Sequence, residues 1–203
     1  MGGALVSAFE PGKEAPALGR IGDWMQTARG GRMYPLDPRP EEIFLDDIAA
    51  ALGRICRFGG HLKAAMGTYS VAQHSVLVAS LVPPDLRRAA LLHDAAEAYV
   101  GDMIRPLKIT APLGAAFKVI ERGVEKAIAV RFGLSPDDFH RPEVKRADAI
   151  VLATERRDVM APGPSWGALT EAPMADRIVF GWNPDEARGT FLFFARELGL
   201  VER

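Results

Sequence analysis

From residue 45 onward, apolar residues recur every three or four positions, which is the spacing of helices that bury one face. Glycines and prolines interrupt this spacing and divide the chain into segments. The pattern predicts helices over 45–58, 70–82, 85–99, 113–132, 142–160 and 183–199. Residues 161–173 are expected to form a loop, and residues 177–182 a short strand. Because strands do not alternate with helices, we expect an all-α fold.

Several of these helices carry signals at their ends. Ser70 opens Ser-Val-Ala-Gln, which fits a capping box, and Asp85 is a suitable N-cap for the next helix. Pro142 suits a first helical position. Gly133 is expected to end the long helix, and the pair Gly59-Gly60 the first one.

The 203 residues suggest one domain preceded by an arm. Residues 1–44 are rich in glycine and proline and show little period, so we expect an irregular N-terminal arm that lies on the domain. Residues 45–203 then form a single helical bundle.

Composition narrows the classes of partner. The net charge is −1, so no basic excess indicates a nucleic-acid duplex or an anionic membrane as the main partner. A small anionic ligand needs only a few local cations and stays open. Cys56 is the only cysteine, which excludes an internal disulfide and a thiolate metal site. With no signal-peptide pattern and no apolar run of ~18 residues, we expect a cytoplasmic protein.

Ionisable residues fall on the apolar faces of three of the expected helices. His74 and His93 each lie on an apolar stripe, with Asp94 at the edge of the second one, and Asp148 and Glu155 share the face of a third. A lone histidine on such a stripe is usually a core residue. A buried carboxylate must be paired or bind a metal, because burying it alone costs several kcal/mol. Inward-facing N and O groups on separate helices are what a bundle needs to hold a metal ion.

His74, His93, Asp94 and Asp148 are therefore the predicted metal ligands. Two imidazoles and two carboxylates suit one divalent ion, namely Mn, Co, Zn, Fe or Mg. An ion that takes about six ligands keeps positions open for water and a substrate oxygen.

Four motifs resemble one known family. They are LLHDAAEAYVGDMIRPLK at 91–108, RICRFGGH at 54–61, YSVAQHS at 69–75 and KRADAIVLATERRD at 145–158. Together with the order His74, His93-Asp94, Asp148, they resemble the HD-domain metal-dependent phosphohydrolases. The similarity is closest to bacterial HD-domain 5′-deoxynucleotidases and small phage-type HD hydrolases, and it covers roughly residues 45–160. It implies a single all-helical HD domain that binds a metal through these four residues.

The resemblance also implies roles for further residues. Glu97 and Asp102 would be catalytic, and Glu97 lies one turn beyond Asp94, where it can orient or deprotonate the attacking water. Asp102 would protonate the leaving oxygen. The residues expected to bind substrate are Arg57, Phe58, His61, Pro106 and Lys108. Of these, Arg57 and Lys108 would hold the phosphate, and Phe58 stands where the deoxynucleotidases have tryptophan. His61 is either a cap, a hydrogen-bond support or a substrate contact.

The expected function is hydrolysis of a (deoxy)nucleoside 5′-monophosphate. The first alternative is a dNTP triphosphohydrolase, which uses the same metal ligands. The second is a non-catalytic nucleotide-binding HD module, although such a module would be expected to lose ligands. Alarmone hydrolysis is disfavoured because Ala98 replaces the second acid of HDxxED. The expected partners are a nucleotide substrate and further copies of the chain in a homo-oligomer, a dimer or larger.

Overall fold

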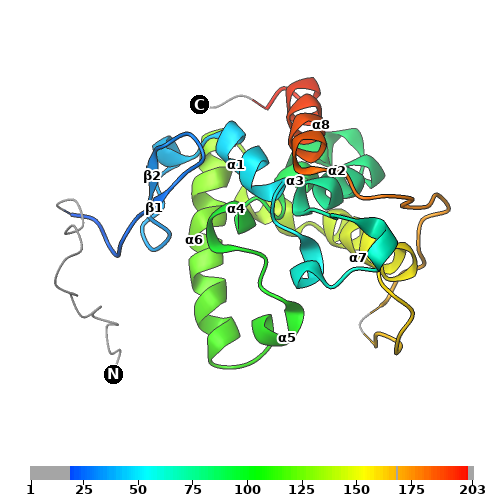
Figure 1. The fold of residues 1–203 in the computed structure, drawn as a ribbon. Coiled ribbons are helices and arrows are strands. Elements are labelled where there is room, and N and C mark those ends of the chain that lie inside the picture. Colours follow the sequence, from blue (N-terminus) through cyan, green and yellow to red (C-terminus); the bar gives the residue numbers. More distant parts are fainter. Residues whose placement is uncertain (1–18, 168, 201–203) are drawn as a thin grey trace.

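The computed structural model describes residues 19–167 and 169–200, and this part of the chain is mostly helical (Figure 1). The α-helices are α1 Leu45–Leu52, α2 Val71–Leu81, α3 Arg87–Leu92, α4 Glu97–Val100, α5 Arg105–Lys108, α6 Leu113–Phe132, α7 Pro142–Asp158 and α8 Pro184–Glu197. Short 3₁₀ helices connect them: η1 Pro40–Glu42, η2 Arg57–Gly60, η3 Ala64–Met66, η4 Pro84–Leu86 and η5 Pro136–His140. Strands β1 Met25–Gln26 and β2 Arg32–Met33 form one small antiparallel sheet. The expectation of a mainly helical fold is confirmed.

Helix α2 lies at the centre of the molecule. It packs against α3, α7 and α8, and its residues from Val71 to Val76 are all buried. A histidine on this helix faces other helices whichever way it points, so the interior position of His74 follows from the packing. Removal of this much apolar surface from water is the main force that holds the bundle together.

Several predicted boundaries are confirmed. Helix α6 covers 113–132, and Gly133 ends it in the left-handed conformation, φ 64°, that glycine adopts readily. Helix α7 begins at Pro142, and Asn183 caps α8 with a capping box. Residues 161–167 and 169–173 form no regular element, as expected of a loop.

Two of the predicted helices differ from the structure. The helix expected over 45–58 ends at Leu52, because the chain that follows pairs with the start of α2 through an isolated antiparallel bridge between Cys56 and Ser70. The helix expected over 85–99 is divided into α3 and α4, and Asp85 lies inside η4. Between the segments expected over 85–99 and 113–132, the chain also forms the short helix α5, which was not expected.

Residues 177–182 do not form the expected strand. The side chain of Gln73, expected to complete a capping box, holds this segment instead. Its amide nitrogen donates to the Phe180 carbonyl at 3.2 Å and its amide oxygen accepts from the Trp182 N–H at 2.8 Å. The buried Gln73 side chain thus makes the backbone hydrogen bonds that a neighbouring strand would otherwise make with this segment. Ser70 does cap α2 as expected, by accepting from the Gln73 N–H.

The described part of the N-terminal segment, residues 19–44, contacts the bundle. Its small sheet is joined to α1 through the Arg29 N–H, which donates to Asp47 at 2.7 Å. On α6, Arg131 donates to the Ile43 carbonyl at 3.0 Å. Residues 1–18 of the predicted arm lie outside the described residues. Within the described residues, no helix combines the length and apolar character that a membrane span requires.

Candidate metal centre

The break between α3 and α4 carries His93 and Asp94. The backbone of this turn stays near helical dihedrals, but Ala95 donates to the Leu92 carbonyl and Glu97 to that of Asp94, three residues back instead of four. Such bonding tightens a helix to about three residues per turn. It separates consecutive side chains by a wider angle than an α-helix does, so His93 and Asp94 reach a common point from different directions.

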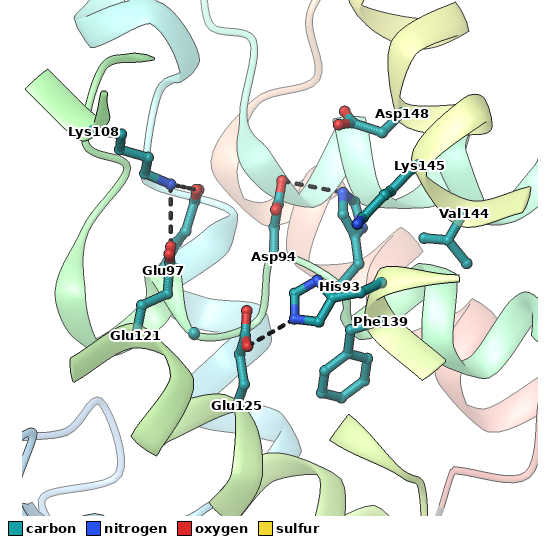
Figure 2. Close-up of a pocket in the computed structure, with 12 residues that line it drawn as sticks. His93, Asp94, Glu97, Lys108, Glu121, Glu125, Phe139, Val144, Lys145 and Asp148 are labelled. Carbon is teal, nitrogen blue, oxygen red and sulfur yellow. Dashed lines mark hydrogen bonds and ion pairs between the residues drawn. The ribbon is translucent and has the colours of Figure 1, made fainter. Parts of the chain in front are cut away.

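The four predicted ligands come together at this turn. His74 Nε2 on α2 lies 3.2 Å from Asp148 Oδ1 on α7 and 3.5 Å from Asp94 Oδ2. His93 Nε2 lies 3.3 Å from Asp94 Oδ2. One possible ligand atom each of His74, His93 and Asp94 falls within a mutual separation of 4.8 Å, a group that can hold a metal ion. Figure 2 shows Asp94 beside His93, with Asp148 above them on α7.

Both imidazoles are oriented by a partner on their other nitrogen. His93 Nδ1 lies 2.7 Å from the Ala90 carbonyl oxygen, which can only accept, so Nδ1 carries the proton. His74 Nδ1 lies 2.8 Å from Glu155 Oε1. Nε2 of each ring is buried and makes no well-aligned hydrogen bond, although a carboxylate oxygen lies 3.2–3.5 Å from it. Two buried ring nitrogens aimed at carboxylates fit a bound cation, and a fixed Nδ1–H is the usual support of a metal-binding histidine.

The electrostatic surroundings of Asp94 and Asp148 also suit a bound cation. Burial acts to raise the pKa of Asp94, but His93, His74 and Arg57 hold it well below its usual range. Burial likewise acts to raise the pKa of Asp148, but His74 and His93 outweigh it and lower that pKa. Burial also lowers the pKa of His93, yet Asp94 and Asp148 raise it to about 9. Each carboxylate thus lies among groups that favour its ionised form, as a metal ligand requires.

Glu155 belongs to the centre although it was not among the predicted site residues. Its side chain is 0% exposed and contacts both His74 and Arg57. The sequence placed Glu155 on the same face of its helix as Asp148, and that position was the available signal. Burial raises its pKa, but Arg57 and His74 outweigh burial and lower it, so the carboxylate is ionised.

Arg57 is turned toward the centre and not toward open solvent. It lies in η2, whose backbone is tied to the start of α2 by the Arg57 N–H, which donates to the Tyr69 carbonyl at 2.9 Å. Arg57 Nε and Nη2 lie 3.0 and 3.1 Å from Glu155, and Nη1 lies 3.6 Å from Asp94. The next residue, Phe58, has φ 58°, a left-handed conformation that is uncommon outside glycine. Its ring lies tilted against that of Trp166, with 5.7 Å between the ring centroids.

Glu97 and Lys108 face each other across the turn. Glu97 is 4% exposed, and Lys108 Nζ lies 3.2 Å from its Oε1 and 3.1 Å from Oε1 of Glu121 on α6 (Figure 2). Burial, and after it the charges of Asp94 and Asp102, raise the pKa of Glu97 well above its usual range. The Lys108 ammonium is thus shared between two carboxylates within the protein.

The other predicted site residues lie further out. His61 and Pro106 are exposed, and the Pro106 carbonyl accepts from the Thr110 hydroxyl at 2.7 Å. Asp102 follows the end of α4 and is half-buried, close enough for its charge to act on Glu97. Of the residues predicted to contact substrate, Lys108 lines the cavity at the centre, whereas Arg57, Phe58, His61 and Pro106 do not.

That cavity has a volume of about 220 Å³. It is lined by His93, Asp94, Ala96, Glu97, Lys108, Glu121, Glu125, Phe139, His140, Val144, Lys145 and Asp148. Sequence reasoning missed Glu121, Glu125, His140 and Lys145, which come from α6, η5 and α7. Five carboxylates face two lysines and two histidines, so the lining is acidic overall.

Comparison with known proteins identifies relatives of the chain. No protein-family model matches it. The uncharacterized protein YfdR of Escherichia coli (strain K12) is 39% identical over 171 residues, which cover 83% of this chain and 92% of YfdR. A second uncharacterized protein, from Rhodobacter capsulatus, is 34% identical over 176 residues, which cover 82% of this chain and 84% of that protein. At this identity and coverage, the chain belongs to the same protein family as YfdR.

Proposed function

We propose that the protein is a metal-dependent phosphohydrolase that acts on nucleotides, in the first place on a (deoxy)nucleoside 5′-monophosphate. The observation that carries the proposal is the orientation of the two imidazoles. His74 and His93 each direct a buried Nε2, which makes no well-aligned hydrogen bond, toward ionised carboxylates beside an acidic cavity. The order of His74, His93-Asp94 and Asp148, with the motifs around them, adds the resemblance to HD-domain phosphohydrolases.

Two imidazole nitrogens and carboxylate oxygens suit Mn, Co, Zn, Fe or Mg, and no thiolate is present to select a soft ion. A divalent ion, when bound, polarises a phosphoryl oxygen and lowers the pKa of a water molecule. His74, His93, Asp94 and Asp148 would hold it. Asp148 is the most exposed of these side chains, at 44%, and lies at the rim where substrate enters.

Glu97 is the residue placed to move a proton. Its raised pKa makes it a stronger proton acceptor than a free carboxylate, and it lines the cavity one turn from Asp94. In the proposed reaction, water attacks phosphorus, its proton passes to Glu97, and the bond from phosphorus to the ester oxygen breaks. A proton from Asp102 reaches the leaving oxygen, which yields nucleoside and phosphate.

Lys145 is the cation best placed to meet the phosphate. It extends from α7 into the cavity, one turn before Asp148 (Figure 2). Its ammonium has no ion pair or hydrogen bond within the described part of the chain. Arg57 and Lys108, the predicted phosphate-binding residues, are each engaged by carboxylates of the protein.

The acidic lining favours one phosphate group over three. A triphosphate carries more negative charge than a monophosphate. Even when a divalent ion offsets two of the five carboxylates, the remaining three outnumber the two lysines and repel each added charge. The dNTP triphosphohydrolase and the non-catalytic nucleotide-binding module are therefore the less favoured alternatives.

A product screen tests the proposal. The purified protein is incubated with nucleoside mono-, di- and triphosphates and with Mn, Co, Zn, Fe or Mg, and products are identified by mass. We expect phosphate and nucleoside from a monophosphate, with about one divalent ion bound per chain. The Asp148→Ala variant should lose most of its metal and its turnover. Release of triphosphate would favour the first alternative, binding without turnover the second, and a folded protein that takes up none of these metals would refute the metal centre.

A further inference from the structure

Glu155 and Arg57 form an ion pair that contacts two of the candidate metal ligands. Glu155 Oε1 lies 2.8 Å from His74 Nδ1 and 3.0 Å from Arg57 Nε, and Glu155 Oε2 lies 3.1 Å from Arg57 Nη2. Both carboxylate oxygens are therefore used. Arg57 in turn reaches Asp94, at 3.6 Å. A continuous path of contacts thus runs from His74 through Glu155 and Arg57 to Asp94.

Neither member of this pair is placed to touch a substrate. Glu155 is fully buried, Arg57 nearly so, and neither lines the cavity. Buried ion pairs are not strong sources of stability, because desolvation of the two charges offsets much of their attraction. A fully buried pair that ends on two ligand side chains therefore calls for a role beyond holding the fold together.

We propose that Glu155 is a positioning residue that keeps the proton of His74 on Nδ1 and, through Arg57, holds Asp94, so that the ligands are arranged before the metal binds. The inference rests on the metal centre of the proposed function. It assigns Arg57 to the frame around the ligands and not to the substrate's phosphate.

The chemistry of the imidazole explains why this position matters. A neutral ring has one N–H and one lone pair, and only the lone pair can bind a metal. In Glu155→Gln, Arg57 would compete for the amide oxygen, which leaves the amide N–H₂ group facing His74 Nδ1. The ring is then driven to place its proton on Nε2, the nitrogen that faces Asp94 and Asp148.

Metal titration of purified variants tests the proposal. Loss of a residue that orients a metal ligand typically lowers metal affinity about 10–100-fold, and we expect this range for Glu155→Gln with Mn or Co. The matched control is Asp158→Asn, which alters another buried carboxylate of α7 that is paired with arginines and contacts none of the four ligands. It should bind metal within about threefold of wild type, since a change below ~0.7 kcal/mol is small.

A second variant covers the case in which Glu155→Gln does not fold because Arg57 is left buried without its partner. The double variant Arg57→Met/Glu155→Leu removes both charges together, a replacement that buried ion pairs often tolerate. It should fold, yet bind metal at least tenfold more weakly. In the metal-free proteins, at a pH high enough for the His74 ring to be neutral, ¹⁵N NMR of the imidazoles should show a slowly exchanging Nδ1–H of His74 in wild type and its loss in both variants.

The outcomes separate the two proposals. If wild type binds metal and a folded Glu155→Gln or double variant binds it within threefold of wild type, the role of Glu155 is refuted and the metal centre stands. The same conclusion follows if the Nδ1–H of His74 is retained in the folded variants. If wild type binds none of the metals, the metal centre is refuted and this inference falls with it.

Discussion

Among single residues, Glu97 lies in surroundings far from those of a free carboxyl group. It is buried, one oxygen is held by Lys108, and the other has no hydrogen-bond partner in the described part of the chain. We expect Glu97→Gln to lower kcat about 10²–10⁴-fold, the range typical of a general acid or base. Metal content should stay close to that of wild type, because Glu97 is not one of the four ligands.

The measurement is steady-state turnover of the best monophosphate together with metal analysis of the same preparation. Loss of metal in Glu97→Gln would make Glu97 part of the ligand set. Turnover close to that of wild type would show that a different group accepts the proton.

The site residues that could be predicted from the sequence are polar side chains that lie on apolar helix faces. Asp148 on an apolar helix face needs a partner, and His74 and His93 lie at the depth where one is required, so their meeting could be inferred from spacing. Glu121 could not be inferred, because it lies on an otherwise unremarkable part of a long helix and only the packing of α6 brings it to the cavity. The direction of the Arg57 guanidinium depends in the same way on the position of Glu155, 98 residues away along the chain.

Among the elements, the contact between α5 and α6 leaves no room for a side chain at one point. A Cβ added at Gly114 would overlap the backbone carbonyl of Lys108. We therefore expect Gly114→Ala to force the two helices apart and to lower the free energy of unfolding by about 1–3 kcal/mol, as overpacking usually does.

Gly123 on the same helix is the matched control. A Cβ there would meet only Pro38, at an ordinary distance of 3.8 Å. Because alanine favours helix more than glycine does, Gly123→Ala should raise the free energy of unfolding by roughly 0.5–1 kcal/mol. Urea denaturation measures both variants, and equal effects of the two substitutions would contradict the argument from close contact.

Elements with local signals at both ends were predictable, and elements shaped by distant contacts were not. Helix α6 ends where Gly133 permits a left-handed turn, which is a local property. Helix α1 ends early because the chain after it pairs with the start of α2 at Cys56 and Ser70, and the segment 177–182 is held by Gln73 in place of a strand partner. Neither contact leaves a trace in the neighbouring sequence.

Across the whole molecule, the charge of the cavity is expected to decide the number of phosphates accepted. Glu121 and Glu125 come from α6 and face α7 across the cavity. The double variant Glu121→Gln/Glu125→Gln removes two negative charges at once. We expect triphosphate binding to strengthen by roughly tenfold relative to monophosphate binding, which is about 1.4 kcal/mol.

Equilibrium dialysis with labelled mono- and triphosphates of one nucleoside, in excess divalent metal, measures this ratio without relying on turnover. An unchanged ratio would mean that the lining charge does not select the substrate.

Asp158 joins the end of α7 to the segment that follows the long loop, and it makes stability depend on pH. It accepts from Arg157, Arg177 and the Ile178 N–H. The Arg157 hydrogen bond lowers the pKa of Asp158 below its ordinary value, although burial opposes this. A lowered pKa means that the stabilisation is complete above the ordinary carboxyl pKa of 3.8 and is lost as the pH falls from there through the lowered value.

Asp158→Asn should therefore lower the free energy of unfolding by about 1.5–3 kcal/mol at pH 7, as expected for hydrogen bonds to a charged group. The difference from wild type should shrink as the pH falls below 4. Denaturation curves across this range test the prediction, and a difference that stays constant with pH would assign the effect to packing and not to charge.

The exposure of the candidate ligands increases in one direction. His74 is fully enclosed, and the exposed fraction of the side chain increases through His93 and Asp94 to Asp148. If the centre holds an ion and a nucleotide as proposed, the ion would lie at the inner end and the nucleotide outside it. A nucleotide that bound first would block the ion, so the ion would have to bind first. A bound nucleotide would then protect the ion from chelators.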